Sequence, residues 1–202
     1  MFRLFLLAAL LAGSARAECV TADDLTRGIS FTRQDGHSGH VQKKGTKVEV
    51  EYVTDRDRWY DSRATRLGIH DTHFSAWMSD AYLLGSLPPE FDWTYGTPPP
   101  EPAAGKTWTT AITQIETDVG FGSYMRRQVT HQRTDLVGRF TVLDAGQGKL
   151  SGCTYRILPV EATFKGGGKS LARRWIYFPD LGFGLETKRD GVQNGLTALT
   201  RG

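Results

Sequence analysis

Residues that commonly build catalytic and metal centres are scarce in this sequence. Its 202 residues include two cysteines and five histidines. No Gly-x-Ser-x-Gly motif occurs, because Gly36-His37-Ser38-Gly39 has a different spacing, and this excludes a serine hydrolase of the nucleophile-elbow type. The glycine-rich segment 165–170 lacks the first glycine of a phosphate-binding loop, since Thr163 stands in its place.

The histidines do not form a recognisable ligand set. His37 and His40 are three residues apart, as are His70 and His73, and His131 stands alone. Zinc and copper sites need about three or four converging ligands. On a helix His70 and His73 would share a face, whereas on a strand they would lie on opposite faces. We therefore expect no metal site and no cofactor, and ordinary polar histidines at turns and sheet edges.

A long hydrophobic run and a strong charge of one sign are also missing. Residues 1–17, MFRLFLLAALLAGSARA, combine Arg3, a short apolar run and an Ala15-Arg16-Ala17 ending, a pattern typical of a secretory signal peptide. The run is far shorter than the roughly 20 residues that span a bilayer. Without this segment 23 basic residues face 22 acidic ones, which argues against nucleic-acid binding. We expect a periplasmic or secreted chain with no transmembrane anchor after cleavage.

Export favours pairing of the two cysteines, because secretory compartments are oxidising. We predict a disulfide between Cys19 and Cys153 within a single β-rich domain, residues 18–190, followed by a C-terminal tail, residues 191–202. The alternative is a buried free Cys153 and a frayed Cys19.

Alternating apolar residues and 23 glycines indicate strands. The clearest is 47–53, in which Val48, Val50 and Tyr52 would share the buried face. Further strands are expected at Ile29 and Phe31 and, downstream, at residues 107–116, 124–132, 136–143, 150–158 and 160–164. The predicted fold is mainly β: a curved antiparallel sheet, either a half-barrel or a sandwich-like meander, with at most one or two short helices and a proline-rich surface arm.

Two regions interrupt this pattern. Around 67–85 the choice between helix and strand stays open, because Phe74, Trp77, Met78, Ala81 and Tyr82 fit helical spacing. The connector 87–105 contains six of the eight prolines and is therefore not expected to be a central strand. It is either an interaction arm or a connector held by Phe91 and Trp93. The arginine-rich segment 54–66 is either an exposed hairpin loop of ion pairs or a site for an anionic headgroup or a polysaccharide.

The richest pattern lies in 172–191. Two strands, 174–178 and 183–188, flank the turn Pro179-Asp180-Leu181-Gly182. Trp175 and Tyr177 would share one strand face and Ile176 and Phe178 the other, which predicts a central strand buried on both sides.

Several of these segments resemble a known architecture. Gly105-Lys106-Thr107-Trp108, Asp144-Ala145-Gly146 before Cys153-Thr154-Tyr155-Arg156-Ile157, and the hairpin 174–182 are similar to motifs of secreted bacterial β-proteins with the half-barrel of periplasmic lipoprotein carriers. The resemblance covers about residues 105–188. It implies a strongly curved sheet around an apolar pocket, with a helix or the proline-rich arm across its concave face, and no catalytic residues.

These observations lead to one functional expectation and two alternatives. We expect an exported, non-enzymatic envelope protein that binds an apolar or lipid-like ligand or an envelope protein. The residues expected to line its core or pocket are Trp108, Tyr155, Trp175, Tyr177 and Phe183. The alternatives are a purely structural protein and a hydrolase of envelope polymers, the latter using acids among Asp55, Asp57 and Asp180 with His70 and His73.

Overall fold

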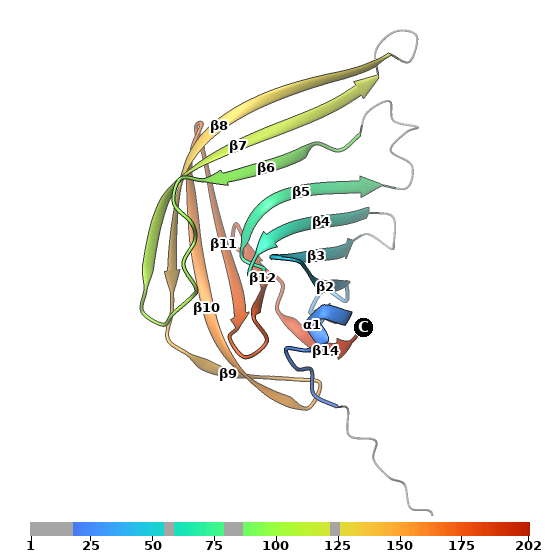
Figure 1. The fold of residues 1–202 in the computed structure, drawn as a ribbon, viewed down its shortest axis with the longest axis vertical. Helices are drawn as coiled ribbons and strands as arrows, with labels where there is room; N and C mark the ends of the chain where they lie inside the picture. The colour runs from blue at the N-terminus through green and yellow to red at the C-terminus, as the bar shows by residue number, and fades with distance from the viewer. Residues whose placement is uncertain (1–17, 55–58, 79–86, 122–125) are drawn as a thin grey trace, which may run out of the picture.

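One large antiparallel sheet forms the protein (Figure 1). The computed structural model describes residues 18–54, 59–78, 87–121 and 126–202. In these residues the strand order is β13-β12-β11-β10-β8-β7-β6-β5-β4-β3-β2-β1-β14, and β9 pairs with β10 alone. The sheet is open, with β13 and β14 at its edges. Its elements are α1 (Asp24–Arg27), β1 (Ile29–Arg33), β2 (Ser38–Lys44), β3 (Lys47–Thr54), β4 (Trp59–Arg66), β5 (His70–Met78), β6 (Glu90–Tyr95), β7 (Thr107–Phe121), β8 (Arg127–Val142), β9 (Gly146–Leu150), β10 (Cys153–Gly166), β11 (Lys169–Phe178), β12 (Phe183–Arg189), β13 (Val192–Gln193) and β14 (Leu196–Arg201).

The predicted fold class is confirmed: the protein is mainly β, antiparallel and curved, with one short helix in the described residues. Strand β3 buries Val48, Val50 and Tyr52 as its alternation predicts. The glycine-rich segment 165–170 is the hairpin between β10 and β11. The predicted signal peptide, residues 1–17, lies outside the described residues.

Residues 70–78 form strand β5 and not the helix considered for them. Phe74 faces the same side of the sheet as Phe91 of β6, its pairing partner, and the two rings lie 5.7 Å apart. Trp77 is 57% exposed, so its ring is not part of the buried face. The helical spacing of the large residues therefore does not describe a buried stripe. Ala81 and Tyr82 lie outside the described residues.

The expectation that no central strand forms in 87–105 is wrong. Strand β6 pairs with β5 on one side and with β7 on the other. The reason is the placement of the prolines, which flank residues 90–95 and leave every donor of the strand in place. Beyond the strand, Pro100 and Pro102 help to enclose a small cavity beside His70 and Phe140.

Two pairs of predicted strands are in fact single long strands. Residues 127–142 form β8, and residues 153–166 form β10 across Pro159. Along one edge, β10 pairs with β9 up to Ile157 and with β8 from Val160. Pro159 lies where the partner changes, so its missing N–H interrupts neither ladder.

The C-terminal residues extend the sheet instead of forming a tail. Strand β13 pairs with β12, and β14 pairs with β1 along Ile29–Arg33. The first and last described strands are therefore neighbours, with Gly202 N donating to Gly28 O at 3.0 Å.

Two apolar cores lie on opposite faces of β11. The first core joins Phe178 to the N-terminal strands, and the second contains Trp175 and Tyr177. Members of the first core include Ile29, Phe31, Val41, Val48, Val50, Tyr155, Phe183, Leu185 and Leu199; those of the second include Ile69, Ile112, Phe140, Leu158, Val160 and Phe164. The C-terminal part of β11 is thus central, as its sequence predicts: Trp175 and Tyr177 are buried on one face, and on the other Phe178 is buried and Ile176 half-buried.

The sheet bends until its two halves touch. Figure 1 shows β10 and β11 running across the direction of β3 to β5. At the point of contact Gly184 N donates to Leu67 O at 2.8 Å. A Cβ added to Gly68, which has φ of 70°, would lie only 2.2 Å from Gly184 O, so this backbone approach requires glycine.

The predicted disulfide between Cys19 and Cys153 is confirmed. It fastens the first described residues to the beginning of β10, and Val20 N donates to the Tyr155 hydroxyl at 3.1 Å beside it. In the described part of the chain there is no helix with the length and hydropathy of a membrane span.

Candidate functional site

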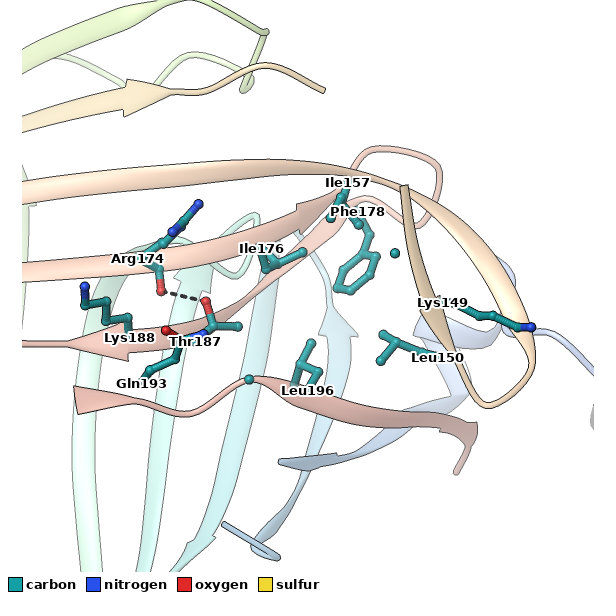
Figure 2. A pocket seen from close by; sticks show the side chains of 12 residues that line it. Lys149, Leu150, Ile157, Arg174, Ile176, Phe178, Thr187, Lys188, Gln193 and Leu196 are labelled. Atoms are coloured by element: carbon teal, nitrogen blue, oxygen red, sulfur yellow. Dashed lines mark hydrogen bonds between the residues drawn. The ribbon is translucent and has the colours of Figure 1, made fainter. Parts of the chain in front are cut away.

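A cavity of about 340 Å³ opens into the first core between β9, β10, β11 and the segment 193–196 (Figure 2). We call it the first cavity. Its apolar wall comprises Leu150, Ile157, Ile176, Phe178 and Leu196. Except for Phe178, which is fully buried, these residues are half-buried and pack against the first core. The cavity therefore presents apolar surface that folding has not covered.

The charged side chains that line the first cavity are all cationic. Arg174 and Lys188 lie close together at one end, whereas the side chain of Lys149 on β9 points away from the cavity (Figure 2). None of the described residues that line this cavity is acidic. The nearest carboxylate oxygen to Arg174, on Glu161, is 3.8 Å away. Such a cavity suits a molecule that has an apolar body and an anionic group.

Sheet geometry explains how these residues come together. Alternation along β11 places Arg174, Ile176 and Phe178 on one face. The hairpin of β9 and β10 brings Leu150 over that face, because β9 pairs with residues 153–157. Thr187 Oγ1 donates to Arg174 O at 3.4 Å, which joins β12 to the wall (Figure 2).

A buried ion cluster lies where the two halves of the sheet meet, and it consists of Arg63, Asp71, Arg173 and Glu186. Each side chain is at most 12% exposed. Arg173 Nη1 donates to Asp71 Oδ2 at 2.5 Å, and Arg173 Nε donates to Glu186 Oε2 at 2.6 Å. Arg63 Nη1 lies 3.4 Å from both carboxylates. The cluster links β4, β5, β11 and β12.

The cluster keeps Glu186 and Arg173 ionised. Burial disfavours the charged form of Glu186, but Arg173 and Arg63 outweigh this effect and hold its pKa well below the usual range. Burial likewise opposes the charge of Arg173, whereas Asp71 and Glu186 raise the pKa of its guanidinium. The cluster contains two cations and two anions, and this balance offsets the free-energy cost of burying the four charges.

His70 is buried among aromatic rings. Its ring lies edge-on to Tyr95, Trp108 and Phe140 at 5.8, 5.4 and 4.7 Å. Burial lowers the pKa of His70 to about 3, although Asp71 opposes this shift. The imidazole is therefore neutral at physiological pH. Its Nδ1 has no hydrogen-bond partner within the described residues.

The five residues expected at a ligand site lie mainly in the cores. Tyr155 and Phe183 belong to the first core, and Trp175 and Tyr177 to the second. Trp108 is half-buried and lines the small cavity beside His70. The five residues are therefore divided between two cores on opposite faces of β11, and none of them lines the first cavity.

The residues considered for a hydrolase are separated in the structure. Asp180 pairs with Arg156 on the surface at 2.8 Å, and His73 Nδ1 lies 2.8 Å from Asp92 Oδ1. His70 is enclosed by the aromatic rings. Asp55 and Asp57 lie outside the described residues. No group of three or more His, Cys, Asp or Glu side chains in the described ranges is arranged to hold a metal ion.

Sequence reasoning missed the cations and aliphatic residues of the first cavity. The signal was present in part, since Arg174, Ile176 and Phe178 alternate on one strand. The position of Lys149 and Leu150 depends on the folding of the β9 arm, which no local pattern specifies. The buried charges of 54–66 were also missed: Arg63 belongs to strand β4 and to the ion cluster, whereas the segment was expected to form an exposed loop or an anion site.

In comparisons with protein-family models, curated proteins and solved structures, the chain gives no significant match.

Proposed function

We propose that this protein is an exported, non-enzymatic carrier or sensor that binds an anionic amphiphile in the first cavity. The observation that carries the proposal is the lining itself: an aliphatic wall formed by Leu150, Ile157, Ile176 and Leu196, with Arg174 and Lys188 at one end and no acidic residue among the described lining residues. An acyl chain would cover the exposed part of the wall, and this burial contributes about 25 cal/mol per Å² of apolar surface. A carboxylate or phosphate would be attracted by the cations.

Two further observations support this function. The disulfide between Cys19 and Cys153 accords with an oxidising compartment such as the periplasm. The resemblance to periplasmic lipoprotein carriers that the motifs in residues 105–188 suggest is an expectation from the sequence, and it favours ligands with acyl chains.

Binding of dodecanoate, compared with dodecanol, tests the proposal by isothermal titration calorimetry. The charge-reversed variant Arg174→Glu/Lys188→Glu should bind dodecanoate about tenfold more weakly and change dodecanol binding much less. Lys43→Glu/Lys165→Glu is the matched control, because both lysines are exposed and neither lines the first cavity. Equal losses in both variants, or no binding of dodecanoate, would show that the proposal is wrong.

Native mass spectrometry provides a complementary test. Protein purified from its own cell envelope should retain an anionic lipid or fatty acid. A mass that corresponds to the protein alone, together with no thermal shift on adding dodecanoate, would contradict the proposed function and favour a structural role.

A further inference from the structure

A second cavity, of about 240 Å³, has a different chemistry from the first. It lies on the opposite face of β11, between β6, β7, β8 and β10. One wall is a row of aromatic rings at alternate positions of β6, formed by Phe91, Trp93 and Tyr95. The rings of Phe91 and Trp93 are stacked 5.9 Å apart. The row presents flat apolar surface inside a cavity and not on the outside of the protein.

Polar side chains of β7 and β8 lie beside this aromatic row on the same face of the sheet. Gln114, the pairing partner of Trp93, lines the cavity together with Glu116 and Thr134. All three are half-buried, and none has a side-chain hydrogen bond to another described residue. Half-buried polar groups without partners destabilise the folded state unless water or a ligand forms hydrogen bonds with them.

Asp71 supplies a further acceptor in the lining. Its Oδ2 is bound by Arg173 at 2.5 Å, whereas its Oδ1 has no hydrogen-bond partner in the described part of the chain. A hydroxyl group at this end of the cavity would provide the donor that Oδ1 lacks.

Charge in the lining selects between ligand classes. Lys169 and Arg173 balance Asp71 and Glu116, so the described part of the lining has no net formal charge. A cationic ligand would meet Arg173 beside Asp71, and an anionic ligand would meet Glu116. An alkyl chain would leave the amide, hydroxyl and carboxylate groups unpaired. The ligand that satisfies both walls is neutral, has apolar C–H faces and carries several hydroxyl donors.

We infer that the second cavity is a binding site for a neutral sugar ring. The C–H face of the ring would pack on Trp93 and its neighbours, since the aromatic face carries partial negative charge and C–H groups carry partial positive charge. The hydroxyls would pair with Gln114, Glu116, Thr134 and Asp71. This site is independent of the first cavity, because the two lie on opposite faces of β11 and share no lining residue.

Saturation-transfer NMR with glucose, galactose and N-acetylglucosamine tests the inference, and glucosamine and glucuronate serve as charged probes. At least one neutral sugar should bind more tightly than both charged probes. Trp93→Ala should weaken that binding at least about tenfold. Trp77→Ala is the matched control, because this tryptophan is 57% exposed and does not line the cavity.

Gln114→Leu keeps the test decisive if Trp93→Ala does not fold, since it removes the polar partner on β7 and retains the apolar volume. It too should weaken sugar binding about tenfold. The inference is overturned if no neutral sugar binds, if a charged probe binds best, or if Trp77→Ala weakens binding as much as the cavity variants. The cavity variants should leave dodecanoate binding unchanged, so a failure here is distinct from a failure of the proposed function.

Discussion

The two faces of β11 are buried in different ways. On one face Ile176 and Phe178 meet the apolar first core, which is fastened by the disulfide. On the other, Trp175 and Tyr177 belong to the second core, and Arg173 continues that face into the ion cluster. Apolar packing tolerates small shifts of one surface on another, whereas ion pairs require particular partners. We infer that the ion cluster fixes how the sheet folds back, and that the first core supplies burial.

Removing Arg173, the central cation of the ion cluster, is the most sensitive test of this difference between the two faces. Arg173→Met should lower the free energy of unfolding by about 3–5 kcal/mol, because Asp71 and Glu186 would then be buried with too little positive charge. Urea unfolding followed by circular dichroism measures the change. Arg133→Met is the control, since Arg133 pairs with Asp135 in a largely exposed position and should cost at most about 1 kcal/mol. Similar costs for the two variants would contradict the role of the cluster.

Removal of the disulfide tests how the first core, on the other face of β11, is stabilised. Cys19→Ala/Cys153→Ala should lower the free energy of unfolding by about 2–5 kcal/mol, because the bond joins residues 134 positions apart and so restricts the unfolded chain. Denaturation of the oxidised wild type and of the variant measures the difference. Cys19→Ala alone should give nearly the same loss, since either change abolishes the bond. A loss below about 1 kcal/mol would mean that the first core holds the N-terminal residues without it.

Acid should affect the second core through His70. Its pKa is about 3 in the folded protein and near 6.5 in the unfolded chain, so the unfolded state binds more protons between these values. Stability is therefore lost as pH falls below about 6.5, by up to about 1.4 kcal/mol per pH unit. His70→Phe should flatten this slope between pH 6.5 and 4.5.

The comparison of wild type with His70→Phe cancels the contribution of Glu186. That carboxylate has a lowered folded pKa, so its stabilising effect is present above its unfolded pKa and is lost at lower pH in both proteins. Unfolding free energies measured at intervals of half a pH unit would reveal the difference in slope. Parallel curves would show that His70 does not titrate on unfolding.

The smallest effect is expected at the turn between β11 and β12. Asp180→Asn removes an ion pair with Arg156 in which both side chains are more than half exposed, so the cost should stay below about 1 kcal/mol. Thermal unfolding gives the difference. A larger cost would mean that Asp180 stabilises the backbone of the turn as well as forming this pair.

Local patterns predicted much of the sheet and little of the candidate sites. Strand β3 and the 172–191 hairpin follow from alternation and turn residues. Strand β6 was missed because the proline content was considered over the whole segment 87–105, whereas residues 90–95 contain no proline. The first cavity, the second cavity and the ion cluster each combine strands far apart in the chain, as in the contact of Arg63 with Glu186, and depend on how far the sheet bends. That bend depends on tertiary contacts such as the one between Gly68 and Gly184, which no single stretch of sequence specifies.

The pairing of β1 with β14 affects the order in which the strands can form. Strand β1 is made early, but its hydrogen bonds to residues 196–201 cannot form until nearly the whole chain is present. Contacts between such distant residues slow folding, because a long loop must close before they contribute. During synthesis one edge of β1 therefore stays unpaired and open to other strands. A chaperone that covers this edge would act in that interval. A variant truncated before β14 keeps the edge of β1 exposed, and we expect it to aggregate more readily than the full chain.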